Sequence, residues 1–226
     1  KHVPLLEQNV IEGIKNNIIG TNILTNLAIK LKIKNFILIS TDKAVRPTNY
    51  MGASKRIAEI ICQSCSLKQK HTKFCIVRFG NVMGSSGSVI PLFKKQIASG
   101  GPITVTNESI ERFFMTITEA AQLVIQAGSM SKGGEIYILD MGKPVNILEL
   151  AKKMCYLHGL NPYLKKSLNN YGNIKIKIIG LRPGEKIREE LTKNNYLMKT
   201  EHSRIFEAKE EFLYNKNLDK KISTIK

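Results

Sequence analysis

Short apolar runs alternate with longer segments of helical spacing along this sequence. The runs have the length and composition of buried strands, which we expect at 36–39, 74–77 and 135–140. Other segments place apolar residues three or four positions apart, which predicts amphipathic helices at 4–32, 56–68, 118–126 and 147–158. Strands that alternate with helices in this way predict an α/β fold built on a parallel sheet.

The first predicted helix, 4–32, is the longest. Its apolar residues are expected to share the side that faces the core: Ile14, Ile18, Ile23, Leu24, Leu27, Ala28 and Leu31. The second predicted helix, 56–68, is expected to bury Ile57, Ile60, Ile61, Cys65 and Leu67 in the same way.

A second region follows the chain break at Gly100-Gly101-Pro102. The segment 103–106 reads as a short strand, and 174–179 alternates apolar and basic residues as a half-buried strand does. After about residue 191 the apolar residues thin out and charge takes over, so we expect little regular structure there apart from a short strand near 204–206.

The polar loop between the strand 36–39 and the helix 56–68 carries the most suggestive chemistry. Thr41, Asp42 and Lys43 stand directly after the strand, so a hydroxyl, an acid and a base are adjacent at its carboxyl end. In open α/β sheets, ligands bind beyond the carboxyl ends of the strands. Met51 and Lys55 are four residues apart on the following helix and therefore share a face.

This loop resembles the extended short-chain dehydrogenase/reductase superfamily, in which a Ser or Thr after a strand faces a Tyr-x-x-x-Lys on the next helix. The run Ser-Thr-Asp-Lys-Ala-Val-Arg-Pro-Thr-Asn-x-Met-Gly-Ala-Ser-Lys-Arg at 40–56 is similar to one branch, the nucleotide-sugar 4,6-dehydratases of bacterial polysaccharide synthesis. Met51 stands at the Tyr position, as in that branch, and Tyr50 is one residue off, about 100° around the helix.

The resemblance implies a Rossmann-like, doubly wound parallel sheet with a small C-terminal substrate-binding lobe. No Gly-x-Gly-x-x-Gly loop is present, so the N-terminal strands that carry it in the family are expected to be missing. By this likeness the dinucleotide-binding domain comprises 1–100, with 117–145 returning to it. The substrate lobe comprises 101–116 and 146–210, and a loose tail comprises 211–226.

The same likeness implies roles for single residues. Asn17, in an Asn-x-x-Gly-Thr pattern, and Ser40 are expected on the cofactor side, with Lys55 holding the nicotinamide ribose. Residues expected to meet the diphosphate, base or ribose of the substrate are Asn81, Val89, Arg112, Arg182 and Glu185. Residue types alone also allow purely structural roles for these segments. These roles are a core helix with a tolerated glycine around Asn17, a flexible turn at 80–88, and a surface ion pair for Arg112.

The reaction implied is the removal of water from a UDP-sugar. Lys43 is expected to remove the C5 proton, Asp42 to protonate the leaving C6 hydroxyl, and Thr41 to handle the C4 proton in place of Met51. NAD is the expected cofactor, with NADP left open, and UDP-N-acetylglucosamine is the substrate that the resemblance favours. Two alternatives remain: a UDP-sugar epimerase of the same fold, against which the adjacent Asp42-Lys43 pair argues, and a truncated, non-catalytic remnant.

Charge and composition bear on the expected partners and the cellular compartment. The formal net charge is +17, but the lysines are spread along the chain and no nucleic-acid motif appears, so no nucleic-acid partner is expected. The sequence has no apolar run of about 18 residues, and no signal peptide is visible in it. The cysteines at 62, 65, 75 and 155 suit buried thiols in a reducing cytoplasm. Together with the family resemblance, which implies a homo-oligomer and membrane anchors in longer relatives, these features lead us to expect a cytoplasmic enzyme without a metal.

Overall fold

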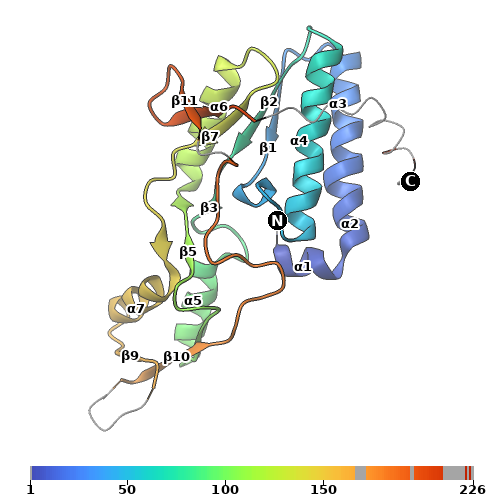
Figure 1. The fold of residues 1–226 in the computed structure, drawn as a ribbon. Coiled ribbons are helices and arrows are strands. Elements are labelled where there is room, and N and C mark those ends of the chain that lie inside the picture. Colours follow the sequence, from blue (N-terminus) through green and yellow to red (C-terminus); the bar gives the residue numbers. More distant parts are fainter. Residues whose placement is uncertain (1, 166–171, 194–195, 211–221, 223, 225–226) are drawn as a thin grey trace. The chain divides into compact units, whose positions relative to one another are not determined.

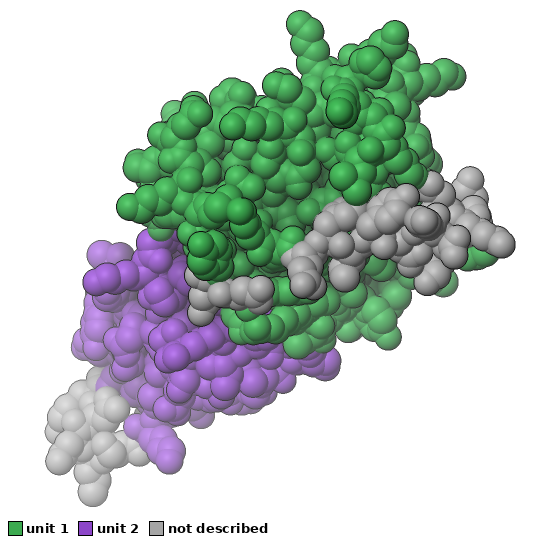
Figure 2. Space-filling model, turned by 45° about the horizontal axis from the view of Figure 1, so that its top comes forward, with its two compact units in different colours: residues 1–79, 118–140, 190–226 green, residues 80–117, 141–189 purple. Residues whose placement is uncertain are grey.

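The computed structural model describes all residues except 1, 166–171, 194–195, 211–221, 223 and 225–226. Contacts divide the chain into two compact units, coloured separately in Figure 2. Unit 1 contains 1–79, 118–140 and 190–226, and unit 2 contains 80–117 and 141–189.

Unit 1 is built on a five-stranded sheet of order β1-β2-β7-β12-β11 (Figure 1). The strands β1 (Asn35–Ile39), β2 (Lys73–Arg78) and β7 (Ile136–Leu139) pair in parallel. β12 (Ile205–Ala208) and β11 (Leu197–Lys199) extend the sheet in antiparallel fashion. The three parallel strands are those that the apolar runs predicted.

Helices cover both faces of this sheet. Alternate side chains of the strands, including Leu38, Ile76 and Ile138, pack with α4 (Tyr50–Lys68) and α3 (Gly20–Lys30) on one face. On the other face, α6 (Ile117–Met130) approaches so closely at Gly128 that an added Cβ would lie 2.2 Å from Cδ1 of Ile37. This arrangement is the doubly wound α/β sheet expected from the sequence.

The predicted helix 4–32 is not continuous. It is divided into α1 (Val3–Gln8), α2 (Val10–Ile14), a π-helical turn η1 (Lys15–Ile19) and α3. The break falls at Asn9, whose φ and ψ of −134° and 54° are not helical. Figure 1 shows α3 running beside α4.

The expected core-facing side of this segment was partly wrong. Ile18 and Ala28 are buried, but Ile23, Leu24, Leu27 and Leu31 are between 46% and 61% exposed. The buried stripe continues from Ile18 through small side chains, Thr21, Thr25 and Ala28, because α3 packs closely against its neighbour. Helical spacing finds apolar stripes but does not decide which stripe faces the sheet. Leu67, expected in the core from α4, is also exposed.

Unit 2 is smaller and more irregular. Its three-stranded sheet has the order β4-β10-β9, from β4 (Ile103–Val105), β10 (Ile174–Ile178) and β9 (Pro162–Tyr163), and all pairs are parallel. Two short ladders join β3 (Asn81–Val82) to β6 (Phe114–Met115) and β5 (Glu111–Arg112) to β8 (Val145–Asn146). The helices α5 (Val89–Ala98) and α7 (Ile147–Leu157) pack on a core that includes Phe93, Ile103 and Ile176.

The boundaries of the two units differ from the expected domains. Residues 80–100 belong to unit 2, since β3 pairs with β6 and α5 packs on the core of that unit. Residues 190–210 belong to unit 1, because β11 and β12 extend its sheet. The predicted tail 211–226 lies almost wholly outside the described residues, and the described Ile222 is buried in the unit 1 core.

Candidate functional site

The loop from Ser40 to Asn49 is held by hydrogen bonds at both ends. Thr41 begins a short 3₁₀ turn, η2 (Asp42–Ala44), and its hydroxyl accepts a hydrogen bond from the Lys43 amide at 3.4 Å. At the other end, the Asn49 side chain caps α4 by accepting from the Gly52 amide at 2.8 Å. Because the loop follows β1 directly, it lies at the carboxyl end of that strand. Open α/β sheets bind their ligands at such ends.

Thr41, Asp42 and Lys43 form one hydrogen-bonded trio. Oδ1 of Asp42 accepts from Oγ1 of Thr41 at 2.8 Å and from Nζ of Lys43 at 3.0 Å. The Asp42 side chain is 0% exposed, whereas that of Lys43 is 15% exposed. Asp42 is thus enclosed by protein, and its hydrogen bonds connect it to two less buried side chains, Thr41 and Lys43. Its Oδ2 atom is buried without a hydrogen-bond partner among the described residues.

A glycine at position 52 allows α4 to approach this loop. An added Cβ at Gly52 would lie 2.1 Å from the carbonyl oxygen of Lys43 and 3.2 Å from Cβ of Pro47. No side chain fits at such a separation. The first turn of α4 and the backbone of the trio are therefore pressed together at Gly52.

Met51 and Lys55 both lie on α4, four residues apart. Met51 is buried, while Tyr50, one residue earlier, is 54% exposed. Nζ of Lys55 donates to the carbonyl oxygen of Ile39 at the end of β1, at 2.9 Å. Burial lowers the pKa of Lys55, and the negative charge of Glu59 partly opposes this effect.

Asn17 lies in the π-helical turn η1 and is buried. Its Nδ2 donates to Oγ of Ser54 at 2.9 Å, and that hydroxyl donates to the carbonyl oxygen of Met51, also at 2.9 Å. π-helical turns occur frequently at functional sites. Asn17 therefore fixes the start of α4 in this structure, and its predicted place on the cofactor side remains a prediction.

Ser40 is directed into the protein. Its hydroxyl is buried and donates to Oε1 of Glu59 at 2.6 Å. Glu59 in turn pairs with Arg78 and Arg56, all buried. Sequence reasoning did not single out these three residues. A signal was present, since Arg78 ends an apolar strand and the pair at 56 and 59 lies three residues apart on a predicted helix.

In unit 2, Arg112 and Glu185 are brought together. Nη2 of Arg112 lies 3.3 Å from Oε1 of Glu185 and donates to the Lys186 carbonyl at 2.8 Å. Nη1 donates to the carbonyls of Glu111 and Ile187. The guanidinium is buried and organises the loop that carries Glu185, which is more than the surface ion pair that residue types alone allowed.

Glu185 uses both oxygens within the protein. Oε1 accepts from Arg112 and from Oγ1 of Thr106, and Oε2 accepts from the backbone amide of Arg182 at 3.1 Å. The Arg182 side chain itself is exposed. The structure thus gathers Arg112, Glu185 and Arg182 at one place in unit 2.

Asn81 and Val89 flank the Gly/Ser-rich loop. The backbone amide of Asn81 donates to the carbonyl oxygen of Phe113 at 3.1 Å. Asn81 therefore lies beside β6, the strand that follows Arg112. Val89 begins α5 and packs at the edge of the unit 2 core. Gly84 and Gly87 in this loop have positive φ values of 73° and 67°, which favour glycine.

The described residues also bear on metal ligands, thiols and membrane-spanning helices. Within the described ranges, no cluster of His, Cys, Asp or Glu could hold a metal ion. The four cysteines are free and buried, and burial raises the pKa of Cys75 to about 11. None of the helices described here is long and apolar enough to cross a membrane.

Comparison with known proteins identifies relatives. A family model described as "Polysaccharide biosynthesis protein" matches residues 1–210. The capsular polysaccharide biosynthesis protein CapD of Staphylococcus aureus is 53% identical over 195 residues, which cover 86% of this chain and 31% of CapD. A UDP-glucose 4-epimerase of Rickettsia canadensis is 36% identical over 203 residues, or 89% of this chain and 56% of the epimerase. The chain thus spans about a third of the length of CapD.

The chain is also similar to proteins of known structure. The structure of Pen from Bacillus thuringiensis has a TM-score of 0.81 and 39% identity, covering 91% of this chain and 62% of that one. The dTDP-glucose 4,6-dehydratase DesIV from Streptomyces venezuelae, solved with NAD, has a TM-score of 0.70 at 18% identity, covering 85% and 62%, a likeness of fold alone. The chain belongs to the polysaccharide biosynthesis protein family, with the fold of the nucleotide-sugar enzymes of the extended short-chain dehydrogenase/reductase superfamily.

Proposed function

We propose that the protein to which this chain belongs removes water from a UDP-sugar, UDP-N-acetylglucosamine, and forms the 4-keto-6-deoxy sugar. The observation that carries the proposal is the trio at the end of β1, in which Asp42 accepts hydrogen bonds from both Thr41 and Lys43. A 4,6-dehydration needs a base at C5 and an acid at the adjoining C6 of one sugar. The trio supplies both within a single turn of chain.

Two protons have to be handled by the trio. The C4 hydroxyl proton passes to Thr41 and from there to Asp42 across the 2.8 Å hydrogen bond. Lys43 is the base that accepts the C5 proton. Asp42 then returns its proton through Thr41 to the C6 hydroxyl, which leaves as water, and Lys43 finally returns its proton to C5. A relay is part of this proposal because Asp42 is fully enclosed, and Thr41 is the hydroxyl that contacts it.

NAD is the proposed cofactor, and it would supply the hydride acceptor for C4 and the donor for C6. The residues near the trio suit it. Lys55 lies at the carboxyl end of β1, where one of its three N–H groups is taken by Ile39, and an ammonium there can hold a ribose hydroxyl. Asn17 and the buried Met51 fix the turn of helix that carries it.

Unit 2 is proposed to hold the nucleotide and diphosphate. Arg182 presents an exposed guanidinium on the loop that Arg112 organises, and Arg pairs with phosphate oxygens in a bidentate manner. Asn81 and Val89 border the Gly/Ser-rich loop, whose backbone amides suit an anion. Glu185 would meet the ribose by exchanging its contact with the Arg182 amide for a hydroxyl.

The test uses the complete protein incubated with UDP-N-acetylglucosamine. Mass spectrometry is expected to show a product lighter by one water molecule. An epimerase, which the likeness to the Rickettsia enzyme favours, would give a product of unchanged mass. A product of unchanged mass, inverted at C4, would replace the dehydratase proposal with the epimerase.

We also propose that the protein is a homo-oligomer. The stripe of Ile23, Leu24, Leu27 and Leu31 on α3 is apolar and exposed in the described structure, and such patches commonly mark protein contacts. Light scattering of the complete protein measures its mass in solution. A monomer at all concentrations would contradict this assignment.

A further inference from the structure

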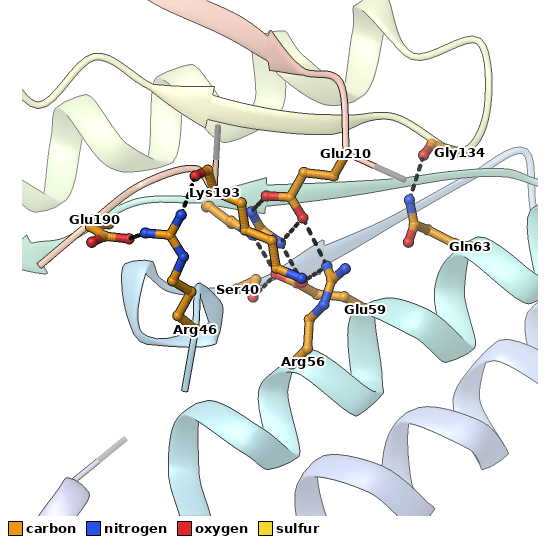
Figure 3. Close-up of polar contacts among 10 residues, drawn as sticks. Ser40, Arg46, Arg56, Glu59, Gln63, Gly134, Glu190, Lys193 and Glu210 are labelled. Carbon is orange, nitrogen blue, oxygen red and sulfur yellow. Dashed lines mark hydrogen bonds and ion pairs between the residues drawn. The ribbon is translucent and has the colours of Figure 1, made fainter. Parts of the chain in front are cut away.

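Four buried charges lie beneath the candidate site in unit 1 (Figure 3). Arg78 and Glu59 are fully buried, and the side chains of Glu210 and Arg56 are 2% and 8% exposed. Arg78 donates to both oxygens of Glu59, from Nε and Nη2, each at 2.7 Å. It also donates to both oxygens of Glu210, and Arg56 bridges the same two carboxylates at 2.8 and 3.2 Å.

These charges come from distant parts of the sequence. Arg56 and Glu59 lie on α4, Arg78 ends β2, and Glu210 follows β12. Although burial opposes its charge, the hydrogen bonds and charges of Glu59 and Glu210 raise the pKa of Arg78, so the group is held ionised.

A buried ion cluster is weak evidence for stability, because well-packed apolar residues in its place are often as stable. Its strict geometry is better suited to fixing the position of what it touches. Here one member of the cluster contacts the loop directly, and the residue next to a second member contacts it as well. Ser40, one residue before Thr41, donates to Glu59, and the carbonyl of Phe79, one residue after Arg78, accepts from the Asp42 amide at 3.3 Å.

A second contact from the C-terminal part reaches the same loop. Arg46 donates to Oε2 of Glu190 at 2.8 Å and to the Lys193 carbonyl at 2.7 Å. Arg46 has a positive φ of 42°, a conformation that costs a non-glycine residue energy and persists when contacts hold it. Figure 3 shows both sets of contacts around the loop.

We propose that Glu190, Lys193 and Glu210 form a C-terminal anchor that positions the Thr41–Asp42–Lys43 trio, with Glu59 as the positioning residue that joins the anchor to Ser40. None of these groups is assigned to touch substrate or cofactor. The anchor holds one end of the loop through Glu210, Arg78, Glu59 and Ser40, and the other through Arg46. Its effect on catalysis rests on the proposed function, while its effect on the loop does not.

Amide hydrogen exchange of the loop tests the anchor directly. The amides of Asp42, Ala44 and Val45 are protected by hydrogen bonds within the loop and to Phe79. Glu210→Gln removes one charge from the cluster, and Arg46→Met removes the exposed contact without leaving a buried charge unpaired. Each variant is expected to speed exchange at these amides about tenfold or more, as loss of one charged hydrogen bond allows, and to leave β10 and α7 of unit 2 unchanged.

The matched control is Glu119→Gln, which also breaks a Glu–Arg pair of unit 1, between α6 and Arg204 at 2.9 Å, and neither residue belongs to the loop. It is expected to leave exchange at 42–45 unchanged. Unchanged exchange at these amides in folded Glu210→Gln and Arg46→Met would overturn the proposal. If Glu210→Gln does not fold, Arg46→Met alone decides.

Kinetics of the complete protein separate positioning from general stability. In both variants kcat of dehydration is expected to fall about tenfold to a hundredfold with KM for the sugar nearly unchanged, because a small displacement of reacting groups is costly. An unchanged kcat in a variant with a loosened loop would refute the positioning role. A wild-type protein that yields no dehydrated product would refute the proposed function, and the exchange experiment would still decide the anchor.

Discussion

Replacing Gly52 by alanine is expected to damage the trio directly. The added Cβ would lie 2.1 Å from the carbonyl oxygen of Lys43, whereas ordinary contact begins at 3.4 Å. The first turn of α4 and the loop must therefore separate by more than 1 Å at this point. The obstacle is backbone, which cannot swing aside as the end of a flexible side chain can.

The size of the effect follows from two opposing terms. Alanine in place of a helical glycine stabilises by about 0.5–1 kcal/mol. Overpacking of a tight contact costs about 1–3 kcal/mol. We expect a net destabilisation of about 1–2 kcal/mol, which lowers Tm by roughly 2–8 °C in a domain of this size.

Thermal unfolding measures this change, with Gly20→Ala as the matched control. Gly20 is also helical, but its added Cβ would meet only the Lys15 carbonyl oxygen at 3.5 Å, an ordinary contact. Gly20→Ala is therefore expected to raise Tm by a few degrees. The reasoning is refuted if Gly52→Ala is as stable as the wild type, or if both variants change Tm in the same direction.

Three further predictions concern single groups. Arg112→Lys is expected to destabilise unit 2 by about 1–3 kcal/mol in denaturant unfolding, because lysine lacks the planar fork that serves three carbonyls and Glu185. Burial alone would raise the pKa of Glu210, but the hydrogen bond and charge of Arg78 bring it below the usual 4.5. Its stabilising contribution is therefore complete above about pH 4.5 and lost as the pH falls further, and Glu210→Gln should flatten that acid limb of a Tm–pH profile. Iodoacetamide at pH 8 is expected to leave Cys62 and Cys75 unlabelled in the native protein, because burial raises the pKa of both thiols; rapid native labelling would contradict their enclosure.

The strands and the loop chemistry of unit 1 were predictable from local pattern. The apolar runs gave β1, β2 and β7, and the polar segment after β1 placed Thr41, Asp42 and Lys43 together, as the structure confirms. These features depend on residues close in sequence. Spacing of four along a helix likewise placed Met51 and Lys55 on one stretch of α4.

Features that depend on distant residues were not predictable in this way. The unit boundary near residue 80 follows from the pairing of β3 with β6, and no signal in the residues themselves announces a two-residue strand. The apolar stripe of α3 was assigned to the core because spacing alone does not show that Thr21, Thr25 and Ala28 make the closer packing surface. Glu59, Arg78 and Glu210 are joined only by tertiary packing.

The most direct measurement is the rate at which the complete protein carrying Lys43→Ala releases water from UDP-N-acetylglucosamine. The matched control, Lys70→Ala, removes an exposed lysine of unit 1 outside the loop. We expect Lys43→Ala to bind the sugar nucleotide and to eliminate water at least about a hundredfold more slowly, as loss of a general base implies, while Lys70→Ala matches the wild type. Elimination by Lys43→Ala at a rate near that of the wild type would contradict the role of the trio.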